Sequence, residues 1–138
     1  MFSKTDITGG QELAGANMVL TDSDGKEIER WVSDGTPHEL IAVLEPGETY
    51  FLTEELPPDG YAFAETIEFT VSEDGTIDRV QMEDKPTRIE ISKFDITGEK
   101  ELPGAELEIR DKDGNLIESW VSDGTSHVIQ GKLIAGET

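Results

Sequence analysis

The sequence predicts an all-β protein, built as an antiparallel β-sandwich that occurs in tandem with the second copy truncated. Three observations predict this class. Several segments alternate apolar and polar residues with a period of two, which is typical of half-buried strands. Turn-forming residues recur about every ten positions, as in sandwiches of short strands. Finally, an internal repeat has the length of a whole domain rather than of a solenoid turn.

The alternating segments and the turns between them define the expected elements. Residues 66–71, 80–83 and 88–93 each place apolar side chains on one face and polar side chains on the other. Asp-Gly pairs separate such segments and favour hairpins, because glycine tolerates a positive φ. No segment has the period of an amphipathic helix, and residues 10–14 are expected to form a short turn at most. The turn signals are at residues 8–10, 23–25, 34–35, 45–47, 57–60 and 73–75.

The repeat has a constant offset of 89 residues, the distance from Trp31 to Trp120. Trp31–Thr36 returns unchanged as Trp120–Thr125, while Ser3–Gly9 and Glu12–Ala16 return with one change each as Ser92–Gly98 and Glu101–Ala105. We therefore expect two modules, residues 1–87 (module one) and residues 88–138 (module two). Module two matches module one up to Thr49, so we expect a part of a longer repeat protein in which module two exposes strand edges and an incomplete core.

The composition narrows the function classes. The chain has 138 residues, with 31 acidic residues against 11 Lys plus Arg, a net charge of −20 and a pI near 4.2. Such a surface repels phosphate groups, so we expect no nucleic acid and no membrane surface among the partners. No apolar run is long enough for membrane insertion, and nothing resembles a signal peptide. The absence of cysteine excludes disulfides, thiolate metal sites and cysteine nucleophiles.

Three charged residues fall on the apolar face of their strands. Lys4, Glu54 and Asp84 each continue an alternation whose other inward positions are apolar. Burial lowers the pKa of a lysine and raises that of a carboxyl, and a neutral amine is a nucleophile. The simpler alternatives are that Lys4 is solvated at the end of its strand, or that it forms an ion pair with the carboxylates without reacting.

Short motifs, in order along the chain, resemble a known family. They are Lys4-Thr5-Asp6, Thr8-Gly9, Leu13-Ala14-Gly15-Ala16, Tyr50-Phe51-Leu52-Thr53-Glu54, Pro58-Asp59-Gly60-Tyr61 and Asp84-Lys85-Pro86. Together they resemble the Cna B-type, or SpaA-like prealbumin-type, repeat of bacterial surface adhesins and pilins. The resemblance covers module one from end to end and module two up to its truncation.

The resemblance implies a fold, a location and a chemistry. It implies an immunoglobulin-like (prealbumin-like) sandwich that serves as a structural stalk or spacer repeat. Such repeats are extracellular, on the bacterial cell surface, and this one would be attached to the cell wall through a region outside this sequence. The expected partners are neighbouring modules of the same protein, and no cofactor, metal or catalytic turnover is implied.

In that family, a lysine of the first strand and an Asn or Asp of the last strand form a spontaneous intramolecular isopeptide bond, assisted by a glutamate. By position, the resemblance implies Lys4 and Asp84 as the cross-link and Glu54 as the catalytic residue. Asn is the commoner acceptor, so Asp84 departs from the usual pattern. Lys93 is the equivalent lysine of module two, and it is unpaired within this chain because counterparts of Glu54 and Asp84 are absent. A split module, in which Lys93 awaits a complementary peptide, is the less favoured alternative.

Two other functions are weighed beside the stalk. The first is an extracellular binding module that recognises a host matrix protein or a glycan through the sandwich loops, since fold alone leaves binding open. The second is a small hydrolase with paired carboxylates, for which Glu54, Glu55 and Asp34 are candidates, although their spacing indicates no substrate cleft.

Three further patterns have simpler structural explanations. Residues 22–25 and 111–114 resemble calcium loops but lack the later acidic ligands, so hairpin turns are favoured. His38 and His127 occur once per module, which favours packed or hydrogen-bonded side chains over metal ligands. Trp31 and Trp120 are expected at the rim or in the core rather than in a sugar-binding platform.

Overall fold

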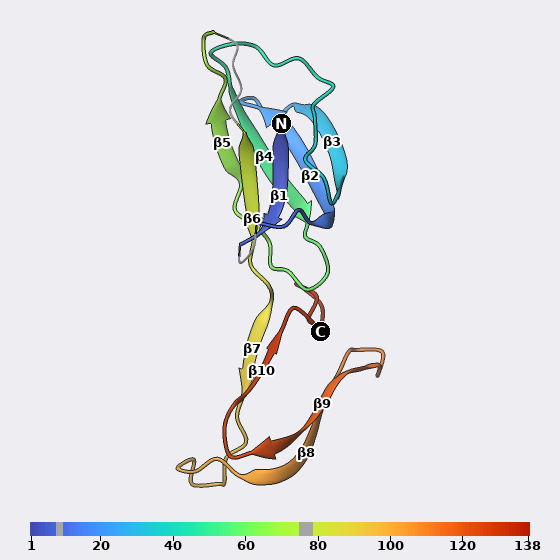
Figure 1. The fold of residues 1–138 in the computed structure, drawn as a ribbon, viewed down its shortest axis with the longest axis vertical. Coiled ribbons are helices and arrows are strands. Elements are labelled where there is room, and N and C mark those ends of the chain that lie inside the picture. The colour runs from blue at the N-terminus through green and yellow to red at the C-terminus, as the bar shows by residue number, and fades with distance from the viewer. Residues whose placement is uncertain (8–9, 75–78) are drawn as a thin grey trace.

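A computed structural model describes residues 1–7, 10–74 and 79–138, which form strands and turns (Figure 1). The strands are β1 (Phe2–Asp6), β2 (Ala14–Asp22), β3 (Glu27–Asp34), β4 (Thr49–Leu56), β5 (Ile67–Thr70), β6 (Val80–Asp84), β7 (Arg88–Ile91), β8 (Pro103–Arg110), β9 (Leu116–Asp123) and β10 (His127–Gln130). Among these residues, there is no helix with the length and apolar character needed to cross a membrane. The turns predicted at residues 8–10 and 73–75 lie partly outside the described residues.

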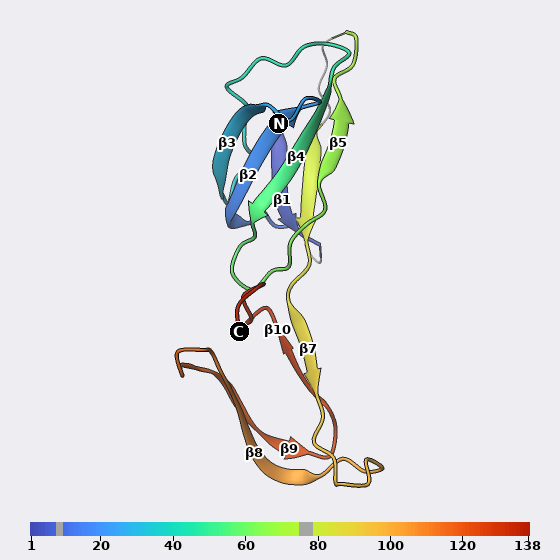
Figure 2. The same ribbon diagram turned by 180° about the vertical axis from the view of Figure 1, so that it is seen from behind.

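Module one is a sandwich of two layers. One layer is the antiparallel sheet β3–β2–β4–β5, and the other is the pair β1–β6. Figures 1 and 2 show β1 and β6 together on one side of the four-stranded sheet. The all-β class and the antiparallel sheets are confirmed, whereas β1 and β6 run parallel. The alternation could not indicate this direction, because a period of two assigns faces and says nothing about which strands pair.

The core lies between the two layers of module one. Its buried side chains come from both layers, so the alternating positions of β2, β4 and β6 meet there. The cluster is Phe2, Ala16, Met18, Leu20, Leu44, Tyr50, Leu52, Val71, Val80 and Met82. Strand β1 departs from simple alternation because Ser3 and Thr5 are buried as well. Both faces of β1 are therefore covered.

The same local structure recurs in both modules, as the sequence repeat predicts. Gly15 and Gly104 have φ values of 98° and 85°, and a register shift follows each of them in the pairing of β2 with β3 and of β8 with β9. In each module, a serine hydroxyl accepts a hydrogen bond from the backbone next to this bulge, at 3.0 Å for Ser33 and 2.9 Å for Ser122. The repeat is thus one of structure and not of sequence alone.

Module two consists of two antiparallel pairs, β8–β9 and β7–β10. Strand β7 ends at Ile91, two residues before the predicted end at Lys93, because β10 provides four pairing positions and the last of them is opposite Ile91. The exposed large apolar side chains of this module are Phe94, Ile96, Leu116, Val121, Val128 and Ile134. Ile129 is its buried apolar residue among those described.

Candidate functional site

Three charged side chains meet inside module one, each from a different strand. Lys4 of β1, Glu54 of β4 and Asp84 of β6 have exposed fractions of 4%, 5% and 0%. Lys4 Nζ lies 2.8 Å from Glu54 Oε1 and donates a hydrogen bond to Asp84 Oδ1. We refer to these three residues as the buried cluster.

The strand pattern explains why the three side chains converge. In the parallel pair, Lys4 lies opposite Met82, so the next inward position of β6 is Asp84 at the end of the strand. Glu54 is the third inward position of β4, after Tyr50 and Leu52. Each side chain therefore reaches the cluster because the alternation of its strand continues one step beyond the apolar core.

The electrostatics of the cluster are those of one amine between two carboxyls. The pKa of Asp84 is raised to about 6, chiefly by burial; the Lys4 amine lowers this pKa, and the neighbouring Glu54 carboxyl adds to the rise. The balance leaves Asp84 easier to protonate than an exposed aspartate. A neutral acid beside an amine is therefore accessible near physiological pH.

One hydrogen bond orients Glu54, and one oxygen of Asp84 has no hydrogen-bond partner among the described residues. Glu54 Oε2 accepts a hydrogen bond of 2.9 Å from the backbone N–H of Ala64. Asp84 Oδ2 is buried and has no hydrogen-bond partner among the described residues. A buried oxygen of this kind costs free energy when it is charged, and less when it carries a proton.

The loop after β4 closes the cluster at its lower end, which the sequence pattern did not indicate. The Tyr61 hydroxyl donates a hydrogen bond of 2.8 Å to Asp6 Oδ2, and this bond raises the pKa of Tyr61. The backbone N–H of Ala62 donates to the carbonyl of Lys85 at 2.8 Å, and that of Ile7 donates to the carbonyl of Asp84 at 3.0 Å. The ends of β1 and β6 are thus held together beside the reactive groups.

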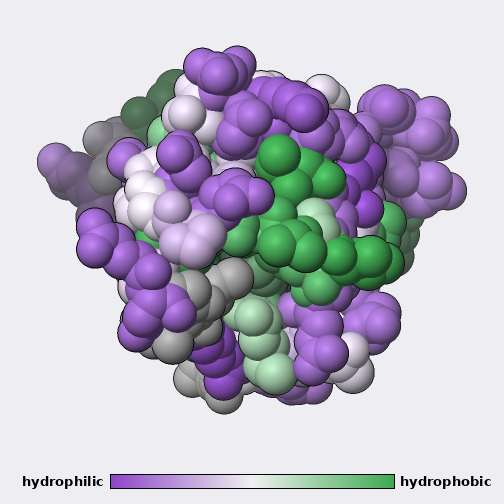
Figure 3. Space-filling model, turned by 90° about the horizontal axis from the view of Figure 1, so that it is seen from above, coloured by the Kyte–Doolittle hydropathy of each residue, from purple (hydrophilic) through white to green (hydrophobic). Residues whose placement is uncertain are grey.

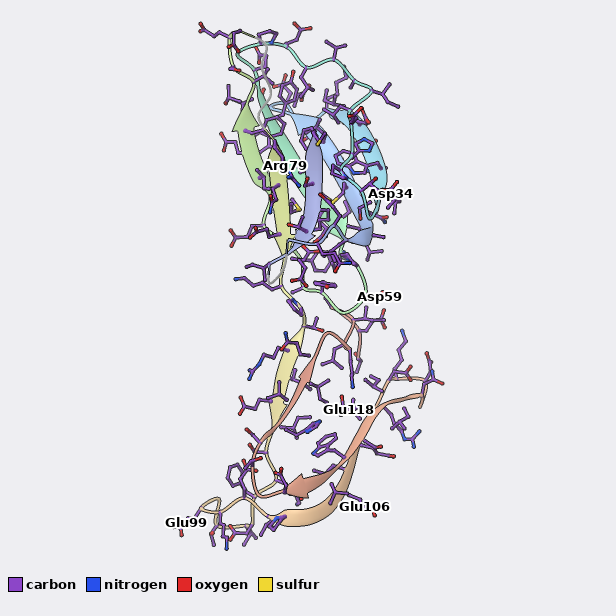
Figure 4. The ribbon with its side chains drawn as sticks, viewed as in Figure 1. Asp34, Asp59, Arg79, Glu99, Glu106 and Glu118 are labelled. Atoms are coloured by element: carbon purple, nitrogen blue, oxygen red, sulfur yellow. The ribbon has the colours of Figure 1, made fainter. Side chains whose placement is uncertain are left out.

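A second polar contact joins the same two strands at their other end. Arg79 Nε donates to the Ser3 hydroxyl at 2.8 Å, and Arg79 Nη2 lies 3.2 Å from Glu12 Oε1. Glu12 Oε2 in turn accepts from the backbone N–H of Lys4 at 3.0 Å. Figure 4 shows Arg79 beside β1. Sequence reasoning missed these residues, and the buried Ser3 explains part of the departure of β1 from alternation.

Lys93, the module-two equivalent of Lys4, is exposed. Its backbone matches that of Lys4, since the carbonyl of each accepts a hydrogen bond of 2.7 Å, from Leu102 and Leu13 respectively. Its side chain takes part in none of the ion pairs found among residues 1–7, 10–74 and 79–138. The backbone position is repeated, but the buried environment is not.

The structure separates the three carboxylates considered for a hydrolase. Glu54 points into the core, whereas Glu55 is exposed and pairs with Arg30. Asp34 lies at the end of β3, where its carboxylate accepts hydrogen bonds from Thr36 (Figure 4). The hydrolase alternative therefore has no converging acid and base among these residues.

The remaining sequence patterns have structural partners. In both hairpins, the first aspartate of the motif, Asp22 or Asp111, accepts backbone hydrogen bonds from the turn, as expected of a turn residue. The imidazole of His38 stacks on Trp31 with ring centroids 4.2 Å apart, and its Nε2 lies 2.8 Å from Glu29 Oε1. His127 stacks on Trp120 at 4.4 Å in the same way. The histidines are packed and hydrogen-bonded as predicted, and each covers one face of its tryptophan.

The two-layer sandwich, its tandem repeat and the charged cluster in its core define a prealbumin-like β-sandwich module. The family model of SpaA, described as a prealbumin-like fold domain, matches residues 1–86 and 87–137, and the chain belongs to this family. No curated protein is similar enough in sequence to be counted as a relative.

The chain is also similar to several solved structures. The chain is similar to the Bacillus anthracis TIE protein, with a TM-score of 0.54 and 26% identity over 94% of this chain and 26% of that one. It is similar to BcpA, the major pilin subunit of Bacillus cereus, with a TM-score of 0.49 and 30% identity over 67% of this chain and 29% of that one. For the shaft pilin SpaA from Lactobacillus rhamnosus GG, the TM-score is 0.45 and the identity 17%, over 62% and 44% of the two chains. The chain thus spans less than half the length of each.

Proposed function

We propose that the chain is a stalk segment of a bacterial surface pilin or adhesin, and that module one forms an isopeptide bond between Lys4 and Asp84. The observation that carries the proposal is the buried contact of one amine with two carboxyls inside a family of surface modules. In this proposal the chain serves as a spacer within a stalk and does not catalyse the turnover of a substrate. The boundary near residue 87 separates two such spacers.

The reaction joins the two ends of the module and releases water. The neutral Nζ of Lys4 attacks the Cγ of protonated Asp84, the new N–C bond forms, and the hydroxyl of Asp84 leaves with a proton as water. The raised pKa of Asp84 favours the protonated acid that this step requires. Its Oδ2, which has no protein partner among the described residues, is suited to be the leaving oxygen.

Glu54 is assigned the proton transfers. Its Oε1 lies 2.8 Å from the attacking nitrogen, within reach to accept a proton from the amine and to pass one to the leaving hydroxyl. The Ala64 N–H holds the other oxygen, so the carboxyl remains oriented toward Lys4. Because the reactants are already in contact in the fold, much of the entropic cost of bringing them together is met by folding.

The bond would serve the stalk mechanically. Lys4 and Asp84 are 80 residues apart in sequence, and a covalent link between them carries a pulling force past the whole intervening chain. The chain has no cysteine to make such a link as a disulfide. An extracellular location, attachment to the cell wall through other parts of the protein, and contact with neighbouring modules belong to the same proposal.

The experiment is the intact mass of the purified chain. We expect a mass one water below that of the sequence, and the full mass in Lys4→Ala and in Glu54→Ala. Asp84→Asn is the sharper variant, because an amide acceptor releases ammonia and the mass should fall by one ammonia instead. The neighbouring Glu55→Gln is the matched control and should lose one water like the unchanged chain. A full mass in the unchanged chain would refute the bond and leave a buried ion pair.

A further inference from the structure

Strand β6 pairs with β1 along one of its two backbone edges, and its other edge is open. The carbonyl of Asp84 accepts from the N–H of Ile7 at 3.0 Å, and the N–H of Val80 donates to the residue that precedes β1 at 3.2 Å. Because backbone groups alternate sides along a strand, Gln81 and Glu83 direct their N–H and carbonyl groups away from β1. No residue in the part of the chain that the structure describes bonds to these groups.

The edge is open because a backbone donor that would cover it bonds to a side chain instead. The segment after β4 begins an antiparallel ladder with the residues that follow β6, where the N–H of Ala62 donates to the carbonyl of Lys85 at 2.8 Å. Bonded positions in such a ladder recur every second residue, so the next donor is Ala64 and its acceptor would be the carbonyl of Glu83. The N–H of Ala64 donates to Glu54 Oε2 at 2.9 Å. The ladder therefore stops before it covers β6.

A groove lies along this open edge, between β6 and the segment that connects β4 to β5. Its volume is about 420 Å³, the size of a ligand-binding cleft. Ile7 and Phe63 line it and have exposed fractions of 45% and 54%. The charged side chains of its lining are the carboxylates of Glu65 and Glu83 and the amine of Lys85. The groove thus combines apolar surface, an excess of negative charge and unpaired backbone groups.

We propose that this groove binds an extended segment of another protein, which adds a strand to the β1–β6 pair. The backbone of the segment would bond to the N–H and carbonyl groups of Gln81 and Glu83, as in strand addition at a free sheet edge. Side chains of an added strand alternate between two faces. Apolar side chains would cover Phe63, and lysine or arginine between them would pair with the carboxylates at Glu65 and Glu83.

Charge distinguishes this occupant from a second copy of the chain. The chain has a net charge of −20, so a strand from a second copy would bring like charges together at the groove. A basic segment would instead be attracted both by the groove and by the field of the whole chain. The inference does not depend on whether the bond between Lys4 and Asp84 forms, because it uses backbone groups and side chains outside the buried cluster.

The first test uses the full chain and a peptide probe of about six residues with blocked ends, in which valine alternates with lysine. Hydrogen–deuterium exchange resolved at single amides should become at least about tenfold slower at Gln81 and Glu83 when the probe is added. The amide of Met82, which faces β1, is the internal control and should change little. Unaltered exchange at Gln81 and Glu83 with millimolar probe would overturn the proposal.

Two altered probes separate strand addition from simple attraction between a basic peptide and an acidic protein. Methylation of every backbone nitrogen keeps the side chains and the charge but removes the donors, and should weaken binding at least about tenfold. Replacement of lysine by glutamate keeps the donors and reverses the charge, and should weaken binding by a similar factor. Equal affinity for the methylated probe would overturn strand addition. Equal affinity for the glutamate probe would overturn the basic partner.

Variants of exposed apolar residues locate the site on module one. Phe63→Ala should weaken binding of the valine–lysine probe at least about fivefold, because Phe63 lines the groove. Figure 3 shows another hydrophobic area, bordered by hydrophilic side chains, at the end of module one away from module two, and residues 41–45 lie at that end (Figure 1). Ile41→Ala, at a 91% exposed position, is the matched control and should bind the probe unchanged. Equal effects of the two variants would place the probe outside the groove and overturn the site.

Glu83→Pro tests the backbone edge itself. Proline removes the outward N–H of this position, and edge strands tolerate proline where that N–H is unpaired. Affinity for the valine–lysine probe should fall at least about tenfold, with the denaturation midpoint as the check that the variant is folded. Full affinity in the folded variant would overturn strand addition. If the variant does not fold, the methylated probe makes the same test without changing the protein.

Discussion

Replacing Glu54 with glutamine should cost module one a large part of its stability without disturbing its packing. Glutamine has the shape of glutamate and can still accept the Ala64 N–H, but it cannot carry the proton that bond formation requires. The cross-link spans 80 residues, for which the chain-entropy relation gives about 4.5 kcal/mol of unfolding free energy. For a module of this size, that corresponds to a Tm lower by roughly 20 to 35 °C.

The assay is chemical denaturation of both proteins, each first checked for its intact mass. Glu55→Gln is the control, because Glu55 is exposed, pairs with Arg30 on the surface, and should change stability by about 1 kcal/mol or less. If the unchanged chain has lost one water and Glu54→Gln has not, yet their unfolding free energies agree within about 1 kcal/mol, the link does not restrict the unfolded chain as reasoned. If both the unchanged chain and Glu54→Gln have lost one water, Glu54 is not needed for the proton transfers assigned to it.

Three further outcomes follow from the site. The neutral acid and neutral amine together hold as many protons as the ion pair. The rate of bond formation after refolding should therefore be constant from about pH 6 up to the pH at which the pair loses its one shared proton, and it should fall below about pH 6 by up to about tenfold per pH unit. A rate that rises toward low pH, followed by mass spectrometry, would contradict this. Tyr61 has a raised pKa, so the stability from its hydrogen bond to Asp6 should be present below about pH 10 and lost as pH rises through the folded pKa. Denaturation of Tyr61→Phe across that range should show no such loss. In the Glu54→Gln background, Leu52→Ala should cost about 2 to 5 kcal/mol, because Leu52 is fully buried, and a change below about 1 kcal/mol in denaturant titration would argue against this core.

The sequence indicated the strands and the buried cluster because both depend on the same local rule. A period of two placed Lys4, Glu54 and Asp84 inward without knowledge of their neighbours, and the structure brings these side chains into contact. The period of two describes β4 and β6 correctly, because in each of these strands every second side chain is buried in the core. It is incomplete for β1, where Ser3 and Thr5 are buried too.

The remaining features depend on segments without periodicity. The contacts of Tyr61 with Asp6, of Ala64 with Glu54 and of Arg79 with Ser3 come from loops or strand ends, where no pattern in the sequence specifies a partner. The parallel direction of β1 and β6 and the open edge of β6 likewise arise from chain topology. Local sequence determines which face a side chain takes, whereas these contacts require the path of the whole chain.

The parallel arrangement of β1 and β6 also determines how module one resists a stretching force before the proposed Lys4–Asp84 bond forms. The chain enters β1 at one end of the sandwich and leaves β6 at the other (Figure 1). Pulling the ends apart therefore slides one strand along its neighbour in shear, so that five paired positions must yield together. An antiparallel pair held at adjacent ends would instead open one pair at a time, like a zipper, at a much smaller force.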